Sequence, residues 1–168
     1  RAVPAPTTLT SAFAASGRQR SLTSNALSEP LFSTPEISAA VSSEAWLRAM
    51  LRFEAALAEA CARRGFISAA SAEAIARATR SVPFDAAEIG ALGVDAANPV
   101  VPFVAALRRA VPPDSAADVH FGATSQDVLD TAMMLVARNG LDIALRELDR
   151  AGAAAAALAE THRNTLIV

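Results

Sequence analysis

The sequence predicts an all-α fold, and its composition and the spacing of its apolar residues lead to this expectation. Hydrophobic residues make up 52% of the 168 residues, many of them alanine, whereas aromatic residues make up 5% and tyrosine is absent. Alanine has the highest helix propensity, while strands favour β-branched and aromatic residues. Beyond residue 40 the apolar residues recur at helical spacing in several stretches. A chain of this length can bury the core of one domain.

The first expected helix has a clear start and end. Ser42 and Ser43 are N-cap candidates, and apolar residues follow at helical spacing from Trp46 to Cys61. Gly65 is expected to end this helix because glycine readily adopts the left-handed conformation found after helix C-termini.

Three shorter helices are expected next. The second runs from about Ser71 to Arg80, and a third begins at a capping box formed by Asp85 to Glu88. The fourth has Asn98 as its N-cap and Pro99 at its first helical position, and it ends before Pro112-Pro113.

The last helix is expected to run unbroken from Thr124 to about Glu160. No proline interrupts this stretch, and apolar residues recur along it. Gly140 could divide it, but one glycine costs only about 1 kcal/mol against alanine, so a single helix is the better prediction. At 1.5 Å per residue, about 38 residues would span roughly 57 Å. A helix this long needs partners along its length, either later parts of the chain or other subunits.

Charge, cysteine content and hydropathy narrow the class of protein. A net charge of −2 gives no reason to expect nucleic acid or an anionic membrane as a partner. No apolar stretch reaches the roughly 20 residues that a membrane span needs. The single cysteine, Cys61, lies on an apolar helical stripe and is expected to be a buried, inert thiol. We therefore expect a soluble, cytoplasmic protein, and no spacing suggests a metal or an organic cofactor.

The first 30 residues are expected to be a disordered extension. They are rich in Ser, Thr, Ala and Pro, and they hold three arginines and a single acid, Glu29. A basic, acid-poor start is also typical of a transit peptide, which stays the alternative. The chain begins with Arg1 and stops after Val168 without a terminating signal, so we expect it to be a fragment of a longer protein.

Polar residues gather from Val119 to Asp127, directly before the last helix. The simpler interpretation is structural, because Thr124 and Asp127 fit a capping box within a turn. Capping does not need the other polar side chains, His120, Ser125 and Gln126. A helix N-terminus favours bound carboxylates, and hydroxyl and imidazole groups there add hydrogen-bond donors. The residues alone thus leave two interpretations, a capped helix start and an anion-binding site.

Three stretches, taken in order, resemble the fumarase/aspartase superfamily. The segment from His120 to Thr131 has the His-x-Gly-x-Thr-Ser-x-Asp form shared by adenylosuccinate lyases and carboxymuconate cycloisomerases. Leu31-Phe32 followed by Trp46 to Ala60 is similar to the N-terminal helix of the cycloisomerases, and Asn98 to Pro102 resembles their second segment. The resemblance covers the chain from about residue 30 to its end, and the 3-carboxy-cis,cis-muconate cycloisomerase family is its nearest branch.

The resemblance implies roles for six residues. In these enzymes the histidine and the Thr-Ser pair line the substrate pocket and bind carboxylate or phosphate oxygens, which implies substrate binding by His120, Thr124 and Ser125. Gln126 and Asp127 would support the pocket and the helix start. Asn98 stands where adenylosuccinate lyases carry a histidine, and asparagine cannot act as a general acid near neutral pH. We expect Asn98 to cap its helix and to face the pocket.

The resemblance also implies an architecture. Residues 31–118 would form a small N-terminal helical domain, and residues 119–168 would begin a central helical bundle. The parent enzyme would be a homotetramer whose active sites combine segments from three subunits, acting on a small tricarboxylate without nucleic acid or membrane as a partner.

The implied reaction is the reversible lactonisation of 3-carboxy-cis,cis-muconate to 4-carboxymuconolactone in protocatechuate catabolism. The superfamily's Gly-Arg-Thr segment with its histidine and its mobile Gly-Ser-Ser-x-Met-Pro loop are absent from this sequence. We therefore expect no catalytic residue within the chain and no activity of the chain by itself. His162 lacks the catalytic motif and is expected to complement a helix C-terminus. The alternatives are adenylosuccinate lyase or a related C–N lyase, and a non-catalytic helical oligomerisation module.

Overall fold

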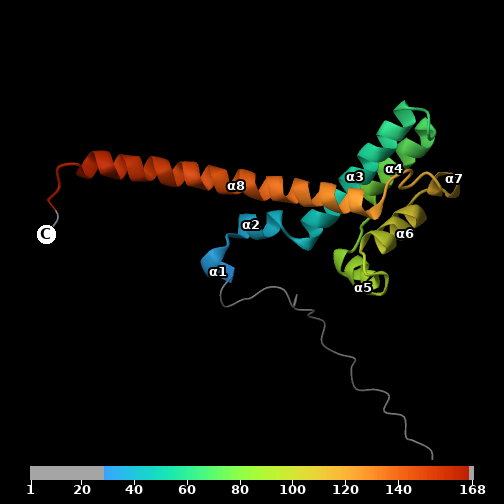
Figure 1. The fold of residues 1–168 in the computed structure, drawn as a ribbon, viewed down its shortest axis with the longest axis horizontal. Helices are drawn as coiled ribbons and strands as arrows, with labels where there is room; N and C mark the ends of the chain where they lie inside the picture. Colours follow the sequence, from blue (N-terminus) through green and yellow to red (C-terminus); the bar gives the residue numbers. More distant parts are fainter. Residues whose placement is uncertain (1–28, 167–168) are drawn as a thin grey trace, which may run out of the picture. The chain divides into compact units, whose positions relative to one another are not determined.

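The computed structural model of the chain describes residues 29–166, and these residues form eight helices and no strand (Figure 1). The all-α prediction is therefore confirmed. In chain order, the helices are α1 (Glu29–Phe32), α2 (Pro35–Ala40), α3 (Ser43–Arg63), α4 (Ala69–Ser81), α5 (Ala86–Ala96), α6 (Val100–Ala110), α7 (Pro113–Ala116) and α8 (Ser125–His162).

Contacts separate the described residues into two units, α1 with Ser33 in one and residues 34–166 in the other. The predicted disordered extension, residues 1 to 30, lies outside the described residues except for Glu29 and Pro30, which begin α1. The predicted domain boundary between residues 118 and 119 stays a prediction.

Helix α3 begins and ends at the residues that the sequence indicates. The Ser42 hydroxyl accepts a hydrogen bond from the Ala45 N–H at 3.2 Å, as an N-cap side chain does. At the other end Gly65 has a φ of 74°, and the Phe66 N–H donates to the Cys61 carbonyl. This six-to-one bond across a left-handed glycine closes the helix.

The predicted starts of α4 and α5 are partly right. Helix α4 begins two residues earlier than expected, because the Ser68 side chain rather than Ser71 caps it. At α5 the Asp85 carboxylate accepts from the N–H groups of Ala87 and Glu88. Among the described residues no bond returns from the Glu88 carboxylate to the Asp85 N–H, so only half of the predicted capping box forms.

Helix α8 is a single helix of 38 residues, and Gly140 does not interrupt it. Its first half packs against α2, α3 and α6, and Val128, Ala132, Val136 and Ile143 face this contact. Every described residue from 145 onward is exposed, and in Figure 1 the red half of α8 runs beyond the helices that contact it. The partners expected for this half are therefore not among the described residues.

The buried core holds the polar segment before α8 in place. Phe103, Ile75 and Leu107 are fully buried in a cluster where α3, α4, α6 and α8 meet. Val119 and Val128 belong to the same cluster and are also fully buried. Because these two valines flank the polar residues, the core anchors the segment at both ends. Within residues 29–166, no helix combines the length and apolarity that crossing a membrane requires.

Candidate functional site at the start of α8

The start of α8 is a complete capping box. The Thr124 N–H donates to Asp127 Oδ2 at 2.7 Å, and the Asp127 N–H donates to Thr124 Oγ1 at 3.3 Å. The Thr124 hydroxyl also donates to Asp127 Oδ2, at 2.8 Å. These bonds lower the pKa of the Asp127 carboxyl, and the bond from the Thr124 backbone N–H has the largest effect. The carboxyl is therefore ionised at neutral pH. The hydroxyl proton of Thr124 is thus engaged within the helix start.

Ser125 and Gln126 differ in how much of their donor capacity the protein uses. The Ser125 side chain is half-buried, and no hydrogen bond joins its hydroxyl to another described residue. Gln126 is exposed, and its amide donates to the Asp130 carboxylate one turn further along α8. The N–H groups of both residues precede the first backbone bond of the helix, so they lack an intrahelical acceptor. The Ser125 hydroxyl and the N–H groups of Ser125 and Gln126 are therefore the free donors at this end of α8.

His120 lies in the turn before α8 in a left-handed backbone conformation, with a φ of 64°. This region is uncommon for a residue with a side chain, although histidine enters it more often than most. Its Nδ1 lies 2.6 Å from Oε1 of Glu54, and the His120 side chain keeps 13% of its exposure. Among the described residues, no hydrogen-bond partner lies at Nε2, on the other edge of the ring.

Glu54 comes from the middle of α3, and its side chain is only 1% exposed. Burial raises the pKa of the Glu54 carboxyl, while the bond to His120 and the positive charge of Arg108 act in the opposite direction. The second oxygen, Oε2, is buried and has no hydrogen-bond partner among the described residues. Glu54 and His120 therefore form a hydrogen-bonded pair that is largely buried.

Sequence reasoning gave Glu54 no role, although a signal was present. In α3 it occupies a position of the apolar stripe, three residues after Leu51 and four before Ala58, and both of these residues are buried. A carboxylate on the buried face of a helix is costly unless it is paired. That pattern alone indicated a partner, but it did not indicate which one.

Asn98 caps α6 as predicted. Its Oδ1 accepts from the Val100 N–H at 2.8 Å, and the side chain is half-buried. The helix itself is assigned from Val100, with Pro99 in a helical backbone conformation just before it. Within the described residues, no hydrogen bond joins Asn98 to His120 or to the start of α8. The structure thus brings five of the six predicted residues together in one segment, and whether Asn98 faces the same pocket stays a prediction.

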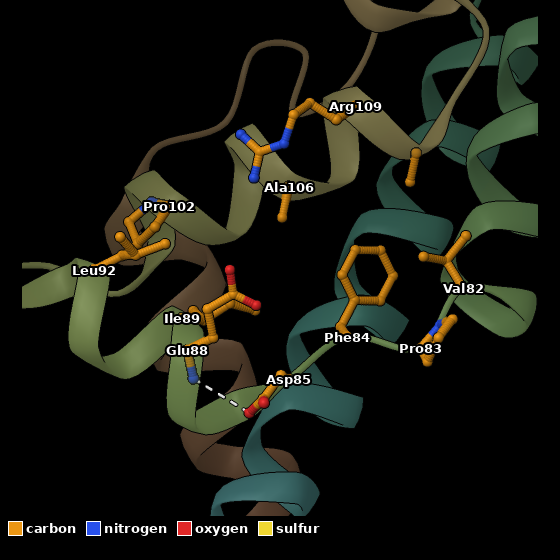
Figure 2. Close-up of a pocket in the computed structure, with 11 residues that line it drawn as sticks. Val82, Pro83, Phe84, Asp85, Glu88, Ile89, Leu92, Pro102, Ala106 and Arg109 are labelled. Atoms are coloured by element: carbon orange, nitrogen blue, oxygen red, sulfur yellow. Dashed lines mark hydrogen bonds between the residues drawn. The ribbon is translucent and has the colours of Figure 1, made fainter. Parts of the chain in front are cut away.

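The pocket in Figure 2 lies elsewhere and suits a different chemistry. It encloses about 250 Å³ between residues 82–92 and one face of α6. Figure 2 shows the carboxylates of Asp85 and Glu88 on one side and the guanidinium of Arg109 on the other. Because two acids and one arginine line this pocket, its charge does not favour the binding of a polyanionic substrate.

A second pocket, of about 310 Å³, is lined almost entirely by apolar groups that include Trp46, Met50 and Leu129. Such a surface cannot replace the hydration of a carboxylate. Neither pocket contains a predicted site residue, so the start of α8 remains the candidate site.

The fold and this segment define an all-helical protein in which a capped helix start carries free hydrogen-bond donors next to an anchored imidazole. The lyase family matches residues 31–168, and the chain belongs to this family. The match confirms the resemblance to the fumarase/aspartase superfamily that the motifs indicate.

The similar proteins include lyases and cycloisomerases with different substrates. A nitrosuccinate lyase from Streptomyces davaonensis is 44% identical over 142 residues, which cover 83% of this chain and 30% of that protein. A 3-carboxy-cis,cis-muconate cycloisomerase from Bradyrhizobium diazoefficiens is 42% identical over 142 residues, which cover 83% of this chain and 32% of that protein. The crystal structure of β-carboxy-cis,cis-muconate cycloisomerase from Acinetobacter calcoaceticus matches with a TM-score of 0.76 and 34% identity, covering 80% of this chain and 32% of that one. The chain thus spans about a third of the length of these relatives.

Proposed function

We propose that the protein carrying this chain is a 3-carboxy-cis,cis-muconate cycloisomerase, and that the start of α8 binds a carboxylate of its substrate. One observation carries the proposal: the Ser125 hydroxyl and the first N–H groups of α8 are free beside a histidine that Glu54 anchors. These groups are the donors that a carboxylate accepts from. The 42% identity to a cycloisomerase supports this substrate within the family.

The proposed reaction explains why such donors would line one wall of the substrate pocket. In lactonisation, an oxygen of one carboxylate bonds to a carbon of a double bond, and the π electrons move to the carbon beside a second carboxylate. The resulting aci-carboxylate is neutralised when an acid delivers a proton to that carbon. Donors fixed before the reaction stabilise the developing negative charge. His120, Thr124 and Ser125 would serve in binding, with Gln126, Asp127 and Asn98 in support, while the catalytic acid and base would come from outside this chain.

A C–N lyase is the second candidate, and the 44% identity to a nitrosuccinate lyase favours it. Elimination from a substituted succinate also passes through an anion beside a carboxylate, so the same donors would serve. Adenylosuccinate is the less suitable substrate because Asn98 cannot take part in proton transfer near neutral pH.

The test gives the intact protein that carries this chain three substrates in parallel: 3-carboxy-cis,cis-muconate, nitrosuccinate and adenylosuccinate. Lactonisation of the first, with little or no turnover of the others, is the expected result. Turnover of nitrosuccinate or adenylosuccinate without lactonisation would replace the cycloisomerase proposal with the lyase. Turnover of none would leave the oligomerisation module as the better interpretation.

Ser125→Ala tests the binding role in the same protein. We expect the Michaelis constant to rise about 10- to 100-fold, the range for losing a hydrogen bond to a charged group. The free energy of unfolding should change by less than about 0.5 kcal/mol because the cap does not use this hydroxyl. Thr131→Ala, which removes an exposed hydroxyl further along α8, is the matched control. Wild-type kinetics of Ser125→Ala would reduce the segment to a helix cap.

Self-association as a homotetramer in the cytoplasm completes the proposal. From Leu141 onward, α8 exposes Leu141, Leu145, Leu148 and Leu158, a series that a helical bundle would cover. Light scattering on the intact protein checks the assembly, and a monomer at micromolar concentration would contradict it.

A further inference from the structure

Glu54 has a structural position that packing does not explain. It stands on the buried stripe of α3, where an apolar residue of the same size would cost less to bury. Its Oε2 has no partner among the described residues, so the surroundings satisfy only half of the carboxylate. The half that is satisfied, Oε1, contacts one group, Nδ1 of His120.

The backbone on both sides of His120 is held as firmly as its ring. The Val119 carbonyl accepts from Arg108 at 3.3 Å, and the Val119 side chain is fully buried. On the other side, the ring of Phe121 stacks on Phe66 with the ring centroids 6.3 Å apart. The left-handed backbone of His120 persists because these contacts determine it from outside. The turn therefore points the imidazole in one direction, and Glu54 fixes the edge that faces inward.

We propose that Glu54 is a positioning residue for His120: by holding Nδ1, it sets the proton position and the orientation of the ring, so that Nε2 faces the ligand. The proposal deepens the proposed function, since it rests on His120 as a carboxylate-binding group. When the pair holds two protons, it is neutral overall and Nε2–H is a donor. When it holds one, Nδ1 keeps the proton, the pair carries one negative charge, and Nε2 is an acceptor.

A carboxylate ligand accepts hydrogen bonds and carries negative charge, so it binds only the form with two protons. Other charged groups act on the same pair. Arg108 of α6 acts on Glu54, and Asp127 at the start of α8 interacts with His120. Glu54 is the described group that is hydrogen-bonded to the imidazole, so it is the group that selects which ring nitrogen holds the proton.

The test uses Glu54→Met and Glu54→Gln in the intact protein. Met keeps the volume and removes the acceptor, while Gln keeps the shape and removes the charge. Nitrogen-15 NMR of labelled histidine reports which ring nitrogen carries the proton, and a His120→Gln variant assigns the signals. In the wild-type protein at high pH, His120 should carry its proton on Nδ1. In Glu54→Met the proton should move largely to Nε2. His162, exposed at the end of α8, is the internal control and should not change.

Binding of tricarballylate, a stable tricarboxylate, provides the second readout. In the wild-type protein its dissociation constant should rise with pH, because Nε2 turns from a donor into an acceptor when the pair loses its second proton. In Glu54→Met, where the neutral ring keeps its proton on Nε2, this rise should largely disappear, and in a His120→Gln background Glu54→Met should change the pH dependence little, because Glu54 acts through His120. A residue needed only for packing would leave the pH dependence of binding unchanged in Glu54→Met.

The outcomes separate this inference from the proposed function. Unchanged histidine signals in a folded Glu54→Met variant would overturn the inference, whatever the ligand does. A moved proton together with wild-type protein that does not bind tricarballylate would support the positioning role and overturn carboxylate binding. If Glu54→Met does not fold, the wild-type protein decides, since a His120 proton on Nε2 at high pH overturns the inference as well. Glu54→Gln, whose amide oxygen can still accept from Nδ1, should keep the wild-type signal pattern.

Discussion

Replacing Gly93 by alanine should destabilise the protein, although helix propensity predicts the opposite. Gly93 is buried in α5, where alanine is favoured over glycine by about 1 kcal/mol. A Cβ at this position, however, would lie 3.0 Å from Cα of Pro99 and 3.2 Å from its nitrogen. Carbon atoms normally meet at about 3.5 to 4.0 Å. The added methyl would thus meet backbone atoms too closely, and the backbone at Pro99 would have to shift by a few tenths of an ångström.

The size of the effect follows from a comparison within the same helix. Gly90 also lies in α5, and a Cβ there would meet nothing within 4 Å. Gly90→Ala should therefore stabilise the protein by about 1 kcal/mol. Overpacking a fitted site costs about 1 to 3 kcal/mol. Since both variants gain the same propensity, the difference between their free energies of unfolding isolates the overlap, and we expect it to be about 1 to 3 kcal/mol.

Denaturant unfolding of the two variants and the wild-type protein measures this difference. The overlap falls on the residue after Asn98, so Gly93→Ala should also weaken substrate binding if Asn98 faces the pocket. Equal stabilities of the two alanine variants would show that α5 and the Asn98–Pro99 corner can move apart freely. That result would refute the close approach on which the reasoning depends.

Three further predictions concern the core, the cap and the buried acid. Phe103→Ala should cost about 3 to 5 kcal/mol in unfolding free energy, because the ring is fully buried where four helices meet, while Val101→Ala on the exposed face of α6 should cost little. Thr124→Ala should cost about 1 kcal/mol by removing the N-cap of α8, and Thr124→Ser should restore most of it. The pKa of Glu54 is raised in the folded protein, so its contribution to stability is greatest below the usual pKa of 4.5 and declines as pH rises through the raised pKa. Unfolding measured from pH 4 to 8 should show this decline in the wild-type protein, and Glu54→Gln should reduce the slope.

The long helices could be predicted because their ends carry local signals. Ser42 and Gly65 delimit α3, and Thr124 with Asp127 opens α8 through bonds among four consecutive residues. Such signals act over one turn, so a sequence displays them directly. Where two serines compete, the pattern is ambiguous. Ser71 looked like the start of α4, yet its N–H and its hydroxyl both bind the Ser68 side chain, which makes it part of the first turn.

The short helices and the acid–histidine pair could not be predicted in the same way. Helices α2 and α7 have six and four residues, too few to show a period, and isolated helices of this length are unstable without tertiary contacts. Glu54 and His120 are 66 residues apart, and only the packing of α3 against α8 brings them together. A sequence pattern can show that a buried acid needs a partner, but the tertiary fold determines which residue that partner is.

The geometry of the site has an energetic consequence for the rest of the protein. Thr124, Gln126 and Asp127 are exposed, and hydrogen bonds and ion pairs in open solvent contribute little. Donors on a helix start acquire catalytic value only when the pocket excludes water and lowers the local dielectric. Under the proposed function, residues outside the described range or from another subunit would therefore have to cover the start of α8, and the exposed second half of α8 offers a surface for them. The Glu54–His120 pair differs from these exposed groups, because it is largely buried and its geometry does not depend on further covering residues.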